Sequence, residues 1–288
     1  MPDESTGVFV HHQGRRVLLK WHKLRRYRSD PPFSVANLRA GLAAGASLEI
    51  DVRALADGAW VCLHDDVLDR ETDGRGRVGE ADTAAIRGLR IAGAEYAPPL
   101  LAEVAREVAA APDTGACLQL DLKEPRESLS PAAVVAFAAA IGPVAKSCLT
   151  SGTDWEAVQD LGTAVPSLRL GFDPLQLAEG RDLADRDSIA AFIEEVAATA
   201  PGAATFYLHY RFVLRALAHG INPVTRLKES GASVDIWTLD PTTPDISGVL
   251  PPILATGVDQ ITTNDPVAMA RLCDRIAHDR KGGDIPCA

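Results

Sequence analysis

Cysteine is scarce in this sequence: the 288 residues include only five, an odd number, and no two have C-x-x-C spacing. They are Cys62, Cys117, Cys148, Cys273 and Cys287. This pattern argues against a zinc cage or a disulfide framework, and it predicts reduced thiols, as in a cytoplasm.

Long apolar stretches are also missing. The start, MPDESTG, is acidic and lacks the apolar segment of a secretory signal. The longest apolar run, Ala132–Ile141, is far below the roughly 18 residues that a membrane-spanning helix needs. We therefore expect a cytoplasmic protein with no transmembrane segment.

Positive charge is in deficit overall but concentrated in one segment. The formal net charge is −10, which disfavours a nucleic-acid-binding protein. Residues 15–28, RRVLLKWHKLRRYR, nevertheless hold seven of the 29 basic residues and no acidic one. The basic residues nearest to His22 are Lys20, Lys23, Arg25, Arg26 and Arg28. This basic segment predicts a small anionic ligand that carries more than one negative charge. A solvated surface, or contact with another protein or an anionic membrane, is the alternative interpretation.

The order of apolar runs predicts an α/β fold. The composition, 47% hydrophobic and 24% charged, is that of a globular protein, and strand-like runs alternate with Ala-rich amphipathic stretches. Predicted strands are Val17–Leu19, Leu48–Val52, Leu118–Leu122, Cys148–Ser151, Ser167–Leu170, Thr205–Leu208, Val234–Leu239 and Asp259–Thr262. Predicted helices are Val35–Ala44, Leu100–Ala110, Pro131–Ile141, Asp154–Leu161, Ser188–Thr199, Arg211–Ala218 and Pro266–His278.

Eight strands, each roughly followed by a helix, favour a closed (β/α)8 TIM barrel over an open doubly wound sheet. No glycine-rich loop follows the first strand, which disfavours a nucleotide-binding sheet. We expect residues 1–288 to form a single domain that ends in a tail of about residues 279–288. The pattern leaves the oligomeric state open.

A β-hairpin is predicted directly after the second strand. In LEIDVRALADGAWVCLHDD, Asp57-Gly58 stands between two strand-like runs, a strong signal for a two-residue turn. Such a turn pairs Asp51 with His64, so that Glu49, Asp51 and His64 share one face while apolar residues share the other.

Two further predicted strands carry polar residues at their ends. The first strand leads into His22, and the strand Leu118–Leu122 is followed by Lys123 and has Asp121 on the same polar face. Active sites of α/β barrels form at the C-terminal ends of the strands. We therefore expect these residues to meet those of the hairpin.

The chemistry of this set indicates a metal-dependent site. Three carboxylates without cysteine suit a hard cation such as Mg²⁺ or Ca²⁺. Two histidines suit general acid–base catalysis because they titrate near neutral pH, and lysines can neutralise an anion in the transition state. Together these groups favour phosphoryl-ester chemistry.

Each candidate residue, taken alone, also has a structural explanation. Glu49 and Asp51 suit salt bridges with Arg53, His22 suits a surface loop, and Trp237 lies on an apolar strand where core packing is the simpler interpretation. The functional interpretation depends on the coincidence of all these residues at predicted strand ends.

The sequence resembles the glycerophosphodiester phosphodiesterase family over most of its length. The resemblance runs from His22-Lys23, where the family has His-Arg-Gly, through GLAAGASLEIDV, DGAWVCLHDDVLDRETDGRGRV and LQLDLKEP to VDIWTLD and GVDQITTNDP. It implies a (β/α)8 barrel with a small insertion after the second strand, here about residues 54–98. It also implies that the barrel uses a metal ion to hydrolyse a glycerophosphodiester-like substrate to an alcohol and sn-glycerol 3-phosphate.

The resemblance also implies roles for the candidate residues. Glu49, Asp51 and Asp121 correspond to the ligands of one divalent cation, Mg²⁺ or Ca²⁺. His22 and His64 correspond to the acid–base pair. Lys23, Lys123 and Trp237 correspond to residues that bind the phosphate and the rest of the substrate.

Departures from the family pattern leave the substrate and the reaction open. Lys23-Leu24 replaces Arg-Gly, residues 31–34 read PPFS where Pro-Glu-Asn-Thr is usual, and Asp121 replaces Glu, as in the sphingomyelinase D-like branch. Lysine offers a point charge where arginine offers a bidentate grip. Two alternatives therefore stand beside hydrolysis: a sphingomyelinase D-like lyase that forms a cyclic phosphate, and a non-catalytic barrel that binds an anion.

Overall fold

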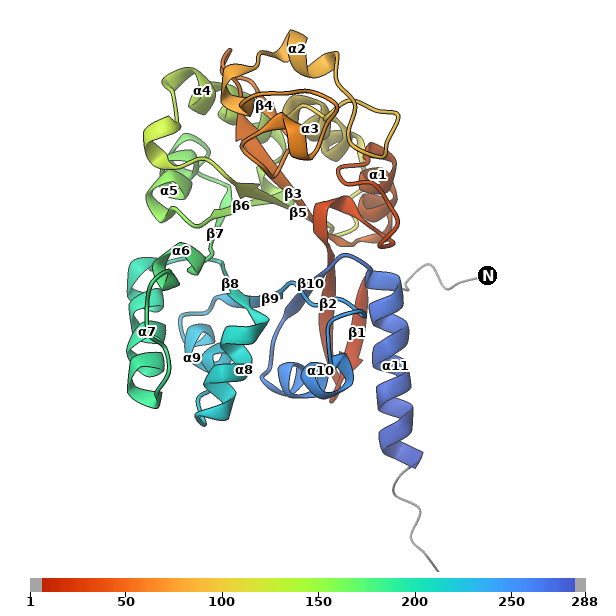
Figure 1. The fold of residues 1–288 in the computed structure, drawn as a ribbon, viewed down its shortest axis with the longest axis vertical. Helices are drawn as coiled ribbons and strands as arrows, with labels where there is room; N and C mark the ends of the chain where they lie inside the picture. Colours follow the sequence, from red (N-terminus) through yellow and green to blue (C-terminus); the bar gives the residue numbers. More distant parts are fainter. Residues whose placement is uncertain (1–6, 283–288) are drawn as a thin grey trace, which may run out of the picture.

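Alternating apolar and polar positions along the chain build ten strands in the computed structural model, which describes residues 7–282 (Figure 1). The strands are β1 (Phe9–His12), β2 (Arg15–Trp21), β3 (Ser47–Ala54), β4 (Trp60–Val61), β5 (Cys117–Leu122), β6 (Cys148–Gly152), β7 (Arg169–Phe172), β8 (Thr205–His209), β9 (Ser233–Trp237) and β10 (Gln260–Thr263). The short β4 pairs antiparallel with β3, and β1 pairs antiparallel with β2.

The other eight strands close into a parallel barrel. Their order is β2-β10-β9-β8-β7-β6-β5-β3, and the pairing of β2 with β3 completes the circle through Lys20 opposite Ser47 and Trp21 opposite Leu48. All eight strands predicted from the sequence are therefore present, and the predicted (β/α)8 barrel is confirmed. The N-terminal β1 was not predicted.

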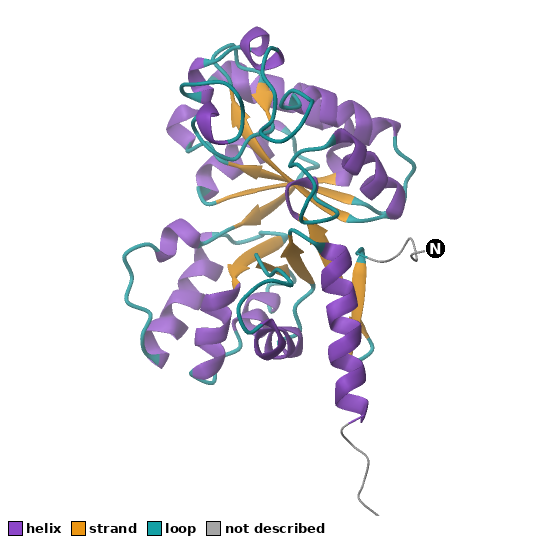
Figure 2. Cartoon of the chain, turned by 45° about the vertical axis from the view of Figure 1, so that its right-hand side comes forward, coloured by secondary structure: helices purple, strands orange, loops and turns teal. Residues whose placement is uncertain are grey.

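Helices surround the barrel on its outer side (Figure 2). The α-helices are α1 (Val35–Ala44), α2 (Thr83–Arg87), α3 (Leu101–Ala110), α4 (Pro131–Ile141), α5 (Trp155–Ala164), α6 (Leu175–Ala178), α7 (Arg186–Thr199), α8 (Tyr210–Ala218), α9 (Pro223–Lys228), α10 (Ile246–Ala255) and α11 (Pro266–Gly282). Short 3₁₀ helices are η1 (His22–Leu24), η2 (Leu68–Arg70), η3 (Val78–Glu80), η4 (Arg126–Ser128) and η5 (Gly142–Ser147). The sequence predicted α1, α3, α4, α5, α7, α8 and α11, and missed the remaining α-helices, most of which are short.

The barrel strands are apolar on the outside and unusually polar on the inside. Leu48, Ile50 and Leu120 are fully buried, since they belong to the apolar core between the strands and the helices. The alternate positions carry polar groups: Lys20 is only 1% exposed, contacts Gln119 and lies 3.0 Å from a carboxylate oxygen of Asp235. Lys20 is therefore a core residue, and the prediction that it is one of the basic residues at the approach to His22 is wrong.

The predicted register of the hairpin is wrong by one residue. Arg53 pairs with Val61, so Asp51 does not lie opposite His64. The connection is a three-residue loop, residues 56–58, closed by a hydrogen bond from the Leu55 amide to the Ala59 carbonyl (2.8 Å). Gly58 has a φ of +81°, a conformation that glycine adopts without strain and that permits this longer loop.

The C-terminal helix also differs from expectation. α11 continues to Gly282, four residues beyond the predicted end at His278, so residues 279–282 are helical and not part of a tail. Residues 1–6 and 283–288, including Cys287, lie outside the described part of the chain. No helix within the described part is both long and apolar enough to cross a lipid bilayer.

The buried ion pair between Lys20 and Asp235 generates the first prediction. Lys20→Met should lower the free energy of unfolding by about 3–5 kcal/mol, because the fully buried Asp235 then keeps only Gln260 and Thr262 as partners for its charge. Urea denaturation measures this loss.

Asp235→Asn, added to Lys20→Met, should recover part of the stability because it removes the unpaired charge. The exposed Lys146→Met is the matched control and should change stability little. Equal effects of Lys20→Met and Lys146→Met would contradict the prediction.

Candidate functional site

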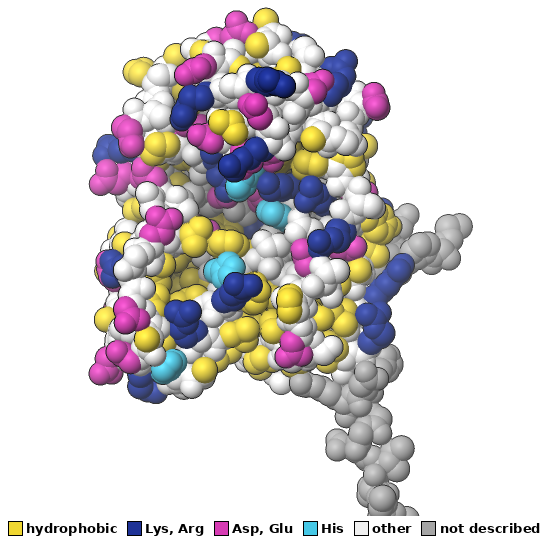
Figure 3. All heavy atoms as spheres, in the orientation of Figure 1, with side chains coloured by type: hydrophobic (Ala, Val, Ile, Leu, Met, Phe, Trp, Pro, Cys, Tyr) yellow, Lys and Arg dark blue, Asp and Glu magenta, His cyan; other side chains and the backbone are white. Residues whose placement is uncertain are grey.

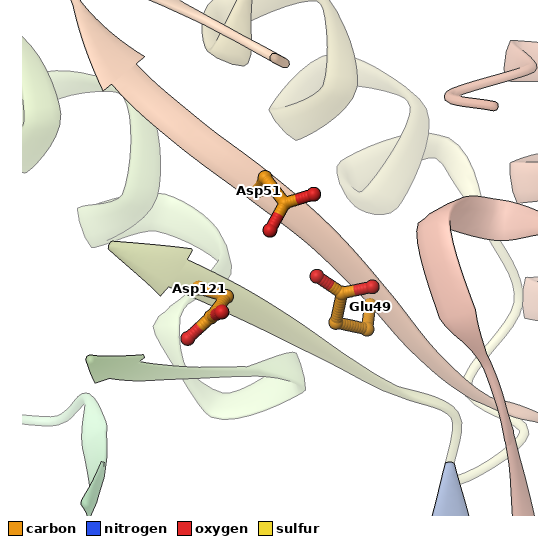
Figure 4. A group of neighbouring side chains, drawn as sticks. All are labelled: Glu49, Asp51 and Asp121. Carbon is orange, nitrogen blue, oxygen red and sulfur yellow. The ribbon is translucent and has the colours of Figure 1, made fainter. Parts of the chain in front are cut away.

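Three carboxylates meet at the C-terminal end of two neighbouring barrel strands. Glu49 and Asp51 belong to β3 and Asp121 belongs to β5, and the strand register places Asp51 directly beside Asp121. Figure 4 shows Glu49 and Asp51 along one strand and Asp121 on the strand beside it. One oxygen atom from each residue lies within 4.8 Å of the others.

Lysines oppose the negative charge of this group. Lys123 Nζ lies 3.0 Å from Asp51 Oδ1 and 2.5 Å from Asp121 Oδ2, and Lys23 Nζ lies 3.4 Å from Asp51 Oδ2. Burial acts to raise the pKa of Asp51, but the two lysines outweigh it and hold that pKa below its ordinary value. Asp51 is therefore an ionised carboxylate, although it is only 1% exposed.

The pKa of Glu49 shifts in the opposite direction to that of Asp51. Burial, together with repulsion by Asp51 and Asp121, raises the pKa of Glu49 well above its ordinary value. Crowded carboxylates of this kind lose their mutual repulsion when a cation binds between them. All the ligand atoms are oxygen, which suits a hard divalent cation, and Asp51 Oδ2 accepts no hydrogen bond from any described residue. The residues therefore fit a divalent metal ion.

His22 lies in η1, directly after β2, and is oriented by an amide. Its Nδ1 lies 2.8 Å from Asn264 Oδ1, while Asn264 Nδ2 donates to Asp240 Oδ2 at 2.9 Å. The second bond fixes the direction of the amide, so His22 Nδ1 is the donor and Nε2 carries the lone pair of the neutral ring. Burial lowers the pKa of His22, which favours this neutral form.

His64 lies in the loop after β4 and depends on Glu71, a residue that the sequence analysis missed. Glu71 Oε2 accepts hydrogen bonds from the backbone amides of His64 (2.6 Å) and Asp65 (2.9 Å), and Oε1 lies 3.5 Å from Lys23 Nζ. The His64 ring contacts Asp65, with Nδ1 2.9 Å from Oδ1. No motif in the sequence marks Glu71 as a site residue. Its negative charge within the insertion is the only feature that distinguishes it.

The loop after His22 has an uncommon backbone. Lys23 and Leu24 have φ values of +53° and +58°, and Phe33 has +59°, a region that favours glycine and asparagine. Leu24 and Phe33 occupy the positions at which the family that the sequence resembles has Gly and Asn. Both side chains are at most 1% exposed, so burial of apolar surface offsets the backbone strain. This conformation lets the Lys23 amide donate to Glu49 Oε2 at 2.7 Å.

A cavity of about 410 Å³ opens above the carboxylates. It is lined by His22, Lys23, Glu49, His64, Asp121, Lys123 and Trp237, together with Gln119, Leu122, Thr153, Asp173, Leu175, Tyr207, Thr238 and Thr262. Seven of the eight candidate residues thus line one cavity, and the eighth, Asp51, lies beneath it against both lysines. Histidine side chains are visible in the hollowed face of Figure 3.

The arginines of the basic segment have structural partners. Arg25 donates to the backbone oxygen of Asp30 and to Asn264, and Arg28 donates to Thr242 (2.6 Å) and Asp240 (3.4 Å). Of this segment only His22 and Lys23 line the cavity. That the segment itself recognises extra charge on the substrate stays a prediction.

Comparison with known proteins decides the family. Residues 31–268 match the model of the Glycerophosphoryl diester phosphodiesterase family. The chain belongs to this family. It is therefore a phosphodiesterase, and the resemblance seen in the sequence is confirmed. The matched range includes all the candidate residues except His22 and Lys23, which precede it. No curated protein matches the chain.

Solved structures with the same fold include several that carry the family name. A glycerophosphodiester phosphodiesterase from Agrobacterium tumefaciens is 20% identical, covers 88% of this chain and 99% of its own, and has a TM-score of 0.63. One from Thermotoga maritima is 18% identical, covers 91% and 100%, and has a TM-score of 0.62. An Oleispira antarctica phosphodiesterase, solved in complex with the product sn-glycerol-3-phosphate, is 22% identical, covers 89% and 96%, and has a TM-score of 0.62.

Asp173, which the sequence analysis also missed, generates a pH prediction. It follows β7, and burial together with the nearby Asp121 raises its pKa to about 8. Between about pH 4 and 8 the folded protein therefore holds a proton that the unfolded chain releases, so stability falls as pH rises through this range. Asp173→Asn should flatten this fall, by at most about 1.4 kcal/mol per pH unit.

Chemical denaturation across this pH range, in the presence of a chelator, measures the effect. Asp182→Asn, at an exposed position in the loop before α7, is the control and should keep the wild-type profile. Identical pH profiles for Asp173→Asn and the wild type would contradict the prediction.

Proposed function

We propose that this chain, acting as a single phosphodiesterase domain, hydrolyses a glycerophosphodiester to an alcohol and sn-glycerol 3-phosphate. The observation that carries the proposal is the convergence of three carboxylates, two histidines and two lysines on one cavity of a family member. The product bound to the Oleispira antarctica relative supports the choice of substrate class.

Glu49, Asp51 and Asp121 would hold one divalent cation, Mg²⁺ or Ca²⁺. When bound, such a cation supplies positive charge that polarises the phosphoryl group. Lys23 and Lys123 add fixed positive charge on the same side of the cavity, where it stabilises the negative charge that builds up on the phosphoryl oxygens during displacement. Because contacts with Asp51 already hold both ammonium groups in position, the two lysine side chains need to move little to stabilise this charge.

The two histidines divide the proton transfers. His22 is suited to accept the proton of the nucleophile, because its Nε2 carries the lone pair and its pKa is lowered by burial. His64 is the candidate for giving a proton to the leaving oxygen, since it lines the same cavity and the Asp65 carboxylate beside Nδ1 orients its ring. Trp237 and Tyr207 line the part of the cavity that the rest of the substrate occupies.

The nucleophile is water in this proposal. A hydroxyl of the substrate next to the phosphate, using the same residues, would instead form a cyclic phosphate, as in the sphingomyelinase D-like alternative. Phosphorus NMR of the first product distinguishes the two, because a phosphomonoester and a cyclic diester have separate resonances. A chain that binds diesters but releases neither product would be the non-catalytic anion-binding barrel.

The carboxylate group generates a prediction about metal dependence. Asp51→Asn removes one negative charge while nearly keeping the shape of the side chain. It should lower kcat at least about 100-fold and abolish the rise in melting temperature that Mg²⁺ or Ca²⁺ produces in the wild type, because an ion that binds only the folded state stabilises it. Calorimetric titration measures the affinity for each ion.

The exposed Asp113→Asn is the matched control for this experiment and should keep the wild-type ion affinity and activity. If Asp51→Asn bound Mg²⁺ and Ca²⁺ as tightly as the wild type, Asp51 would not be a ligand.

The histidine roles generate a second prediction. His22→Ala and His64→Ala should each lower kcat about 10²–10⁴-fold on a diester with an alkyl leaving group. On a diester with a 4-nitrophenyl leaving group His64→Ala should recover most of its activity, because that group departs without protonation, whereas His22→Ala should not. The double variant should be far less impaired than the product of the two losses. Equal losses for His64→Ala on both substrates would exclude His64 as the acid.

A further inference from the structure

A second cavity adjoins the catalytic one. It has a volume of about 230 Å³ and shares four lining residues with the first cavity, Asp173, Leu175, Tyr207 and Trp237. Its own wall comes from α8 and the segment around α6 and α7. We call it the side pocket. Figure 3 shows hydrophobic and basic side chains gathered on the hollowed face of the molecule next to the histidines.

Two arginines of the side pocket have no counter-charge. Arg211 and Arg215 line it from α8, and neither forms an ion pair with a carboxylate of any described residue; Arg211 Nε donates only to the hydroxyl of Tyr210. Arg186 and Arg275 likewise form no ion pair with a described carboxylate, whereas ten other arginines do. Examples are Arg39 with Glu107, Arg126 with Asp160, Arg181 with Glu195 and Arg226 with Glu194.

This placement costs stability in the ligand-free protein. Arg211 and Arg215 are four residues apart on one helix face, where like charges repel each other. Arg211 also lies in the first turn of α8, near the positive end of the helix dipole, and that turn contains no acidic residue. An anion bound in the side pocket would relieve both repulsions.

A third arginine, Arg181, also lines the side pocket, but it is paired with Glu195. The remaining wall is mostly apolar or uncharged. Phe212 and Leu183 contribute apolar surface, and Leu175, which lines both cavities, leaves 44% of its surface exposed. His209 accepts a hydrogen bond from the Arg211 amide through Nδ1 and packs edge-on against Trp237, with ring centroids 4.9 Å apart. Asp173, at the junction of the two cavities, is the one carboxylate among the lining residues.

We propose that the side pocket binds one arm of the substrate diester, and that this arm is an apolar chain ending in a negatively charged group, a carboxylate or a phosphate. The phosphodiester would lie in the catalytic cavity, the apolar part of the arm against Leu175 and Trp237, and the terminal anion between Arg211 and Arg215. The inference rests on the proposed function for the placement of the phosphodiester.

The test uses four glycerophosphodiesters whose second arm is a six-carbon chain ending in a methyl, an ammonium, a carboxylate or a phosphate group. The wild type should cleave at least one of the two anionic esters with a kcat/KM at least tenfold above those of the methyl and ammonium esters, and comparison of the two anionic esters identifies the preferred anion. Arg211→Gln and Arg215→Gln should each reduce this ratio at least fivefold. Arg275→Gln, at an exposed position on α11, should leave it unchanged.

Binding is measured separately, with the His22→Ala/His64→Ala variant and calorimetry on the uncleaved esters. If an anionic ester binds more tightly than the methyl and ammonium esters, and Arg215→Gln removes this difference, the side pocket is supported. This holds even if the wild type cleaves no ester, and the absence of cleavage would overturn only the proposed function. Cleavage of all four esters with equal kcat/KM and equal affinity would overturn the side pocket and leave the proposed function intact.

Discussion

The charge balance around Asp51 is the constraint on which the rest of the site depends. A carboxylate that is only 1% exposed stays ionised because Lys123 and Lys23 contact its two oxygens. These lysines come from different strand ends, so the closed barrel both buries Asp51 and supplies the positive charges that keep its carboxylate ionised. The same closure brings Glu49 and Asp121 within ligand distance and raises the pKa of Glu49. The fold thus holds together negative charges that would otherwise repel one another, and a divalent cation would complete their neutralisation.

A second layer of contacts orients the groups that would handle protons and phosphate. The Asn264 amide, held by Asp240, sets the tautomer of His22. Glu71 connects the insertion to the barrel, since one of its oxygens accepts from the backbone at His64 and the other lies near Lys23. The site therefore depends on residues from the first and last strand ends and from the insertion, which lie far apart in the sequence. An arrangement of this kind is rigid only when every one of these elements is in place.

Much of the fold could be predicted from periodicity, because buried strands and amphipathic helices differ in the spacing of apolar residues. All eight barrel strands were predicted in this way. The register of the hairpin was not, because Asp57-Gly58 is compatible with both a two-residue and a three-residue loop, and the left-handed φ of Gly58 selects the longer one. His64 nevertheless lies in the site. It follows the end of β4, and the hydrogen bond from its backbone amide to Glu71 holds it in place. The convergence was thus correctly expected, although the pairing that suggested it was wrong.

The sequence by itself determined the family, the barrel and a set of candidate residues, because these depend on local patterns and on residue types at strand ends. The tertiary structure alone decided what each charge does. Lys20 and Lys23 are three residues apart in the same basic segment, yet one is buried against Asp235 and the other lines the cavity. Likewise, only the folded chain leaves Arg211 without a carboxylate while pairing Arg181 with Glu195. The physical reason is that burial and the distance to counter-charges, which control the energy of a charged group, arise from contacts between residues distant in sequence.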